Sequence, residues 1–239
     1  MPEPVHALAH RPLTVEAVAE FVGLPAEPQI PEDAVEEAVR KRGWSWEHEL
    51  VCDALTTGHG HVLCSEAYVP FGHPGARSFL VFGEVYPVDP HDEEMSNGPW
   101  LFPCMDDWQN QPGWSGARPA TVEDCEEALT RAAQAVTAHL GRAPERTLVS
   151  DAAVVTGPAM THRIWRIPTL TPDSAPGPGL TLTPTPTHAL ILGPHADNGP
   201  YGYLTPLQLS CTPLSYGPDL PPAQDETALA AWIAAHVDW

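Results

Sequence analysis

The sequence predicts an α+β fold with a largely antiparallel sheet, a long central helix, N-terminal helices and a C-terminal helix. Segments with helical spacing lie near both ends and in the middle of the chain, and the segments between them have the composition of short strands. The 29 prolines and 18 glycines among 239 residues interrupt regular structure often, which predicts many Pro/Gly-rich loops. Strands and helices alternate too sparsely for a doubly wound parallel sheet.

Helices are expected first along the chain. Thr14 is a good N-cap for a short amphipathic stretch that ends near Gly23. A second helix is expected over 31–43, because a proline and two acids open it and basic residues precede its final glycine. Residues 44–57 are expected to form a third helix, with three large apolar residues on or near one side.

The remaining elements follow from hydrophobic spacing and turn residues. Residues 61–71 and 78–88 are expected to pair as an antiparallel hairpin across a His-Pro-Gly turn. Thr121 and Asp124 resemble a capping arrangement for a helix over 121–140, which Gly141 ends. The later expected elements are strands near 146–155, 161–170, 188–192 and 203–210, and a closing helix over 224–237.

The organisation expected is a single α+β domain over 1–239, with a division into two lobes, 1–116 and 117–239, as the other option. The segment Thr171–Pro186 is rich in threonine and proline, which favours an extended hairpin excursion or mobile loop of polyproline character.

Charge decides which partners are plausible. Acidic residues outnumber basic ones 31 to 11, the formal net charge is −20, and Lys41 is the single lysine. Such a field attracts cations and basic proteins and repels nucleic acid, anionic lipid and phosphorylated substrates. Neither nucleic acid nor membrane is therefore expected as a partner, and no apolar run approaches the roughly 20 residues of a membrane span.

Localisation is expected to be cytoplasmic. The first residues lack a basic region followed by an apolar stretch, which argues against a secretory signal. The five cysteines are odd in number, widely spaced and without a CxxC pair, so we expect reduced thiols.

The predicted partner-binding site is an acidic segment between residues 89 and 116 that has no convincing periodicity. Its carboxylates would attract a basic protein over long range, and its tryptophans would supply contact area. The alternative is that the tryptophans point inward and the acids are merely solvated. The residues assigned to this site are Asp92, Glu93, Glu94, Trp100, Asp106, Asp107, Trp108 and Trp114.

Three other groups of residues are of types that carry chemistry. His59, His61 and Cys64 are competent zinc ligands, but their spacing matches no known zinc module, so metal binding stays open. The basic residues around Trp165, which are His162, Arg163 and Arg166, are expected to form internal salt bridges to the acidic first part of the chain, with an anion site as the alternative. His195 and Asp197 lie in a sequence typical of a turn, and no nucleophile elbow or phosphate-binding glycine loop accompanies them.

These observations favour an acidic protein-binding module, most simply an immunity or antitoxin-type inhibitor that neutralises a basic partner such as a toxin or nuclease. No catalytic residue, metal or cofactor is assigned, and the oligomeric state is left open. The first alternative is a metal-assisted hydrolase with ligands drawn from His59, His61, His91, Asp92 and Glu94. The second is a structural or scaffold subunit that uses unpaired strand edges.

Overall fold

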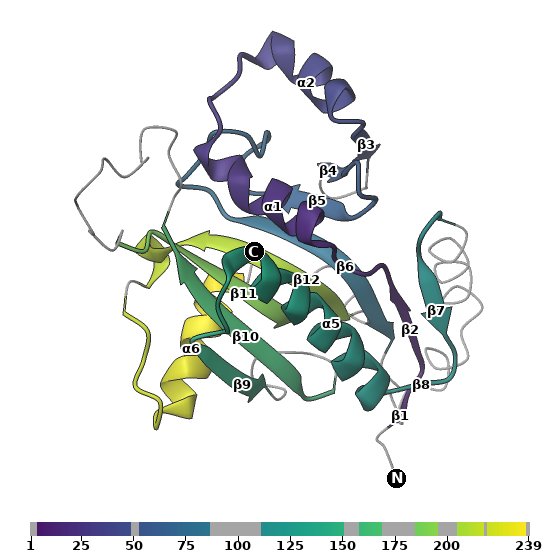
Figure 1. Ribbon diagram of the computed structural model, residues 1–239, viewed down its shortest axis with the longest axis vertical. Coiled ribbons are helices and arrows are strands. Elements are labelled where there is room, and N and C mark those ends of the chain that lie inside the picture. The colour runs from purple at the N-terminus through teal and green to yellow at the C-terminus, as the bar shows by residue number, and fades with distance from the viewer. Residues whose placement is uncertain are drawn as a thin grey trace.

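The computed structural model describes residues 4–48, 53–86, 111–150, 158–168, 185–195, 205–217 and 219–237. A large sheet forms the centre of the fold (Figure 1), and every strand pair within the described residues is antiparallel. Helices α1 (Val15–Gly23) and α5 (Val122–Leu140) cover one face, and α6 (Glu226–Val237) covers the other. The predicted α+β class is confirmed.

The strands of the main path follow one another across the sheet in the order β3-β4-β5-β6-β12-β11-β10-β9. Their bounds are Ser45–His48 for β3, Asp53–Thr56 for β4, Val62–Ser65 for β5, Ser78–Tyr86 for β6, Thr205–Pro213 for β12, His188–Pro194 for β11, Met160–Ile167 for β10 and Arg146–Ser150 for β9. Strand β2 (Ala7–His10) pairs with β6 and with β7 (Ser115–Ala117), and β1 (Pro4–Val5) pairs with β8 (Ala120–Thr121). Short 3-10 turns cover Leu24–Ala26, Glu32–Ala34 and Leu214–Tyr216.

Local capping signals place the helices where the sequence predicts them. Thr14 caps α1 by accepting a hydrogen bond from the backbone N–H of Ala17 at 3.2 Å. Thr121 and Asp124 form a reciprocal capping box at the start of α5, and Gly141 ends that helix in the left-handed conformation. The second predicted helix is α2 (Val35–Lys41), and the closing helix is α6.

The third predicted helix, over 44–57, is wrong, because β3 and β4 form a hairpin there. Trp46 pairs with Leu55 across the two strands, and β4 pairs in turn with β5. The ring of Trp46 stacks on Tyr68 at 5.6 Å, and that of Trp44 stacks on Phe71 at 5.4 Å. Residues two apart share a face of a strand but not of a helix. The packing of Trp44 and Trp46 against the loop over 66–77 therefore favours the hairpin.

The predicted hairpin of β5 and β6 is confirmed, although β5 ends at Ser65 and a loop over 66–77 joins the two strands. The later predicted strands correspond to β9, β10, β11 and β12. Most of the Thr171–Pro186 segment, and the expected strand ends at 155 and 170, lie outside the described residues.

Two buried cores flank the sheet. The larger lies under α1 and α5 and includes Phe82, Leu129 and Trp165, which are at most 1% exposed. The smaller lies under α6 and includes Ile164 and Ile233, both fully buried. Adjacent residues on β10 thus serve different cores, which is the alternation expected of a central strand.

A β-bulge in β6 reverses this alternation. The pairing with β12 shifts register between Leu207 and Gln208, and Phe82 is the extra residue on β6. Phe82 and Val85 both lie in the larger core although they are three residues apart, and Tyr86 lies in a separate cluster on the opposite face. An inserted residue explains this change of side.

One end of the sheet carries three connections. Because β6, β12, β11, β10 and β9 are successively antiparallel, Tyr86, His195 and Ser150 lie at the same end. Residues 196–204 and 151–157 therefore join the described structure at this end, which we call the Tyr86 end. Residues 87–110 leave the sheet there after Tyr86 and rejoin the described structure at Gln111, next to Pro112, whose carbonyl accepts from Arg11 beyond the other end of β2.

Candidate functional site

The predicted partner-binding segment falls mainly outside the described residues. Asp92, Glu93, Glu94, Trp100, Asp106, Asp107 and Trp108 lie there, and Trp114 is the one assigned residue that the structure describes. The Trp114 ring is 8% exposed, packs with Ala7, Ala9 and Tyr86, and donates from Nε1 to the Gly60 carbonyl at 3.2 Å. It helps to anchor the segment's end to the sheet, and its part in partner binding stays a prediction.

The start of α5 adds exposed acids near the Tyr86 end. Thr121 pairs with Pro4 and Ala7 pairs with Tyr86, so the helix start and the end of β6 are joined through one short N-terminal segment. Figure 1 shows β1, β8 and the first turn of α5 together at this side of the molecule. The exposed acids on the helix are Glu123, Asp124 and Glu127.

Most of the basic side chains form ion pairs with carboxylates of the same chain. Among the described residues, eight lysines and arginines contact carboxylates of six glutamates. Carboxylates outnumber cations among the described residues, as they do in the whole sequence.

Arg163 and Arg166 form the predicted internal salt bridges, but the prediction is wrong for His162, whose ring contacts Ser150 and the Pro194 carbonyl instead. Arg163 lies 3.5 Å from Glu126 of α5, and Arg166 lies 2.8 Å from Glu145. Both glutamates belong to the acidic first part of the chain, as expected. Trp165 is fully buried and donates from Nε1 to the Arg142 carbonyl at 3.2 Å.

A buried serine–histidine pair near the Tyr86 end has no signal in the sequence. Ser150 Oγ lies 2.6 Å from His162 Nδ1, and His162 Nε2 donates to the Pro194 carbonyl at 2.8 Å. Burial lowers the pKa of His162 to about 4, so the ring is neutral at pH 7 and Nδ1 accepts from the serine hydroxyl. Both side chains are at most 2% exposed, so this pair links β9, β10 and β11 as part of the interior.

Replacing Gly193 by alanine is expected to destabilise the protein by about 2 kcal/mol, because overpacking a core costs about 1–3 kcal/mol. An added Cβ would overlap the His162 ring, with Cγ and Nε2 at 2.8 Å. Urea unfolding measures the change. Gly23→Ala is the matched control, because nothing lies within 4 Å of its added Cβ and a helical alanine is neutral or stabilising. Equal stabilities for both variants would contradict the expectation.

The described candidate metal ligands have other partners, and His91, Asp92 and Glu94 lie outside the described residues. His59 lies 3.7 Å from Glu20, His61 donates from Nε2 to the Pro12 carbonyl at 3.2 Å, and Cys64 packs with Ala54 and Phe79. Within the described ranges no group of three or more metal-ligating side chains is gathered. The described cysteines Cys64, Cys125 and Cys211 are buried, and burial raises the pKa of Cys125 and Cys211 to about 12.

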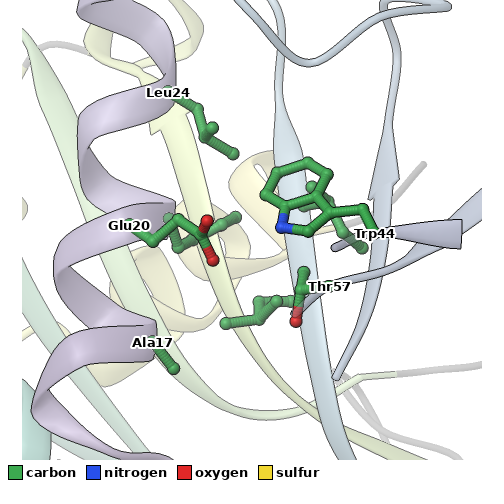
Figure 2. A pocket seen from close by; sticks show the side chains of 8 residues that line it. Ala17, Glu20, Leu24, Trp44 and Thr57 are labelled. Atoms are coloured by element: carbon green, nitrogen blue, oxygen red, sulfur yellow. The ribbon is translucent and has the colours of Figure 1, made fainter. Parts of the chain in front are cut away.

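A pocket between α1 and the first strands brings three polar side chains together (Figure 2). Glu20 comes from α1, Trp44 precedes β3, and Thr57 follows β4. The indole nitrogen of Trp44 lies on the edge of its ring that faces the Glu20 carboxylate and Thr57. The rest of the wall is apolar and buried, and consists of Ala17, Phe21, Leu24, Leu63 and Leu80.

Trp44 Nε1 is a buried donor without an acceptor among the described residues. Leaving such a donor unpaired costs about 1–3 kcal/mol. The space between these walls is too narrow to admit a water molecule. Sequence reasoning missed this pocket, because its walls come from segments separated by up to 63 residues, from Ala17 to Leu80.

A scan against protein-family models found no matching family, and searches of curated proteins and of solved structures found no match. Within the described part of the chain, no helix combines the length and apolarity needed to cross a lipid bilayer.

Proposed function

We propose that this protein is an acidic protein-binding module of the immunity or antitoxin type, which neutralises a basic partner such as a toxin or nuclease in the cytoplasm. The observation that carries the proposal is that the segments connected at one end of the sheet are rich in acidic residues and lack basic ones. Residues 151–157 and 196–204, which join the sheet at the Tyr86 end, and residues 87–110, which leave the sheet there, together contain eight aspartates and glutamates and no lysine or arginine.

The neighbouring described surface supports the same assignment. Glu123, Asp124 and Glu127 are exposed at the start of α5, whereas the cations at this side are few. Arg118 is exposed there, and Arg131 is held by Glu127 at 3.0 Å. Clustered carboxylates raise the rate of encounter with a basic protein, and salt weakens this effect by screening.

Neutralising three acids of the predicted segment is expected to slow association with the basic partner about tenfold at 50 mM salt. The variant carries Asp92→Asn, Glu93→Gln and Glu94→Gln. The partner is first captured from the native lysate at low ionic strength and purified, and association is then followed by biolayer interferometry. The difference from the parent is expected to shrink at 0.5 M salt.

A matched control separates local from total charge. Glu32→Gln, Asp33→Asn and Glu36→Gln remove three exposed acids at the start of α2, and both triple variants change the formal charge from −20 to −17. The control is expected to associate within a factor of two of the parent. Equal slowing in both variants, or failure to capture any basic protein, would contradict the proposal.

A further inference from the structure

Strand β9 lies at one border of the sheet (Figure 1) and pairs with β10 alone among the described strands. In an antiparallel edge strand, the backbone N–H and C=O groups of alternate residues point away from the sheet, where another strand can pair with them. Many edge strands discourage such pairing with lysine, proline or a β-bulge. The register of β9 on β10 is unbroken from Arg146 to Ser150, and β9 contains neither lysine nor proline. Its outer edge is therefore suited to accept a further strand.

The exposed side chains of β9 are β-branched. Val149 is 64% exposed, and Thr147, two residues earlier on the same face, is exposed as well. Leu148 lies on the opposite face and packs against the smaller core under α6. β-Branched side chains pack well against their neighbours on an adjacent strand. A strand added beside β9 would therefore cover Val149 and Thr147 as well as form backbone hydrogen bonds.

The Arg146 end of β9 carries an excess of cations. Arg142 and Arg166 share the Glu145 carboxylate, at 3.5 and 2.8 Å. Arg146 pairs in register with Ile164, which lies two residues before Arg166 on β10. Among the described residues Arg146 has no carboxylate within salt-bridge distance, and its Nε is buried without an acceptor. A basic partner is therefore repelled from this end of the strand, and an acidic surface is attracted to it.

The Ser150 end of β9 is acidic by comparison. Ser150 lies at the Tyr86 end, where the connections contain carboxylates and no lysine or arginine. Glu126 of α5 accepts from the backbone N–H of Thr161, opposite this end of β9, and exposed Glu123 lies one helical turn before Glu126. The charge along β9 thus changes from basic to acidic over five residues. Two such strands are complementary when they run antiparallel, because each basic end then meets an acidic end.

We propose that two copies of this chain associate in solution through the outer edges of their β9 strands, which pair antiparallel about Leu148. Val149 of each copy then lies opposite Thr147 of the other, and Arg146 lies opposite Ser150. The pairing joins two sheets across a two-fold axis and leaves no free β9 edge, so the assembly stops at two copies. This contact is separate from the proposed partner binding, because it needs no basic protein.

Sedimentation equilibrium of the purified chain at concentrations from about 5 to about 500 µM tests the proposal. A five-residue strand forms a small interface of the transient kind, so we expect a monomer–dimer equilibrium with a dissociation constant of about 50 µM. A chain that stays monomeric at about 500 µM would overturn the proposal and leave the edge to a strand of another protein. An assembly larger than two copies would also overturn it.

Substitutions of Val149 test whether β9 forms the contact. Val149→Lys is expected to raise the dissociation constant at least about tenfold, because it sets a cation against the basic end of the second copy. Val149→Glu removes the same apolar contact but sets a carboxylate there, so only about threefold weakening is expected. Ser45→Lys changes an exposed residue of β3, at the opposite border of the main strand path, and is the matched control. It is expected to stay within about twofold of the parent.

Each variant changes an exposed residue, so the fold is expected to be kept, and circular dichroism checks this. Equal weakening by Val149→Lys and Ser45→Lys would overturn the proposal, because association would then depend on total charge and not on β9. Equal weakening by Val149→Lys and Val149→Glu would overturn the antiparallel arrangement.

Discussion

At pH 5 the protein is expected to be about 4 kcal/mol less stable to unfolding than at pH 8 because of His61 and His162 alone. Burial lowers the pKa of each ring to about 4, from 6.5 in the unfolded chain. The unfolded state thus binds more protons in this range. The contribution of these two histidines to the free energy of unfolding is fully present above pH 6.5 and is lost as the pH falls toward 4. About 2 kcal/mol is lost per histidine at pH 5.

The surroundings of the two rings explain why neither accepts a second proton readily. Protonating His162 at Nδ1 would remove the acceptor of the Ser150 hydroxyl and place a cation near Arg163 and His195. His61 is 1% exposed, and the charges of Arg11 and His59 oppose its protonation. No described carboxylate contributes to either shift.

Urea unfolding between pH 5 and 8 measures this loss, in 0.5 M salt to screen repulsion among the surface carboxylates. The double variant His61→Gln/His162→Gln is expected to start from a lower stability but to show a flatter pH dependence. His139→Gln, in the last turn of α5, is the control and should keep the parent's slope. A parent that loses less than about 1 kcal/mol over this range, or a double variant with the parent's slope, would contradict the expectation.

Replacing Trp165 by alanine is expected to cost about 4 kcal/mol of unfolding free energy. The side chain is fully buried between the sheet and α5, and its Nε1 bond to the Arg142 carbonyl fixes the turn after that helix. Truncation leaves a large cavity and an unpaired carbonyl. The free energy from urea unfolding at pH 8 is the measurement.

Trp165→Phe keeps the prediction measurable if the alanine variant does not fold. It retains most of the apolar volume and removes the hydrogen bond, so a loss of about 1–2 kcal/mol is expected. Val149→Ala on the edge strand β9, where the side chain is 64% exposed, is expected to change stability by less than about 0.5 kcal/mol. Similar losses for Trp165→Ala and Val149→Ala would refute this view of the core.

The sequence predicts best those elements whose signals are local. The caps of α1 and α5 depend on side chains within three residues of the groups they satisfy, so Thr14, Thr121 and Asp124 locate the helix starts. The strands of the second half were likewise predicted from local composition and turn residues. The pairing of β12 with β6 and the bulge at Phe82 depend on distant partners and were not predicted.

The error at residues 44–57 has the same physical origin. Apolar residues in this window fit a helix about as well as a hairpin, and what decides between them is packing of Trp44 and Trp46 on the loop after β5. That contact joins residues more than 20 positions apart.

The candidate sites likewise divide into those with a signal in the sequence and those that depend on contacts between distant residues. Excess carboxylates and the Arg163 and Arg166 salt bridges were predicted from charge alone. The Trp44 pocket and the Ser150–His162 pair required knowledge of which strands are neighbours. The partner-binding role of the acids between residues 89 and 107 stays a prediction, because these residues lie outside the described structure and Trp114 is the one assigned residue that it contains.

The shared attachment of three connections at the Tyr86 end has a consequence for how this protein tolerates change. The described residues of the two larger cores all lie outside those connections, so under the proposed function changes in the connections would alter recognition while leaving these core residues unchanged. Natural variation concentrated there would let related chains discriminate among partners while retaining a common scaffold.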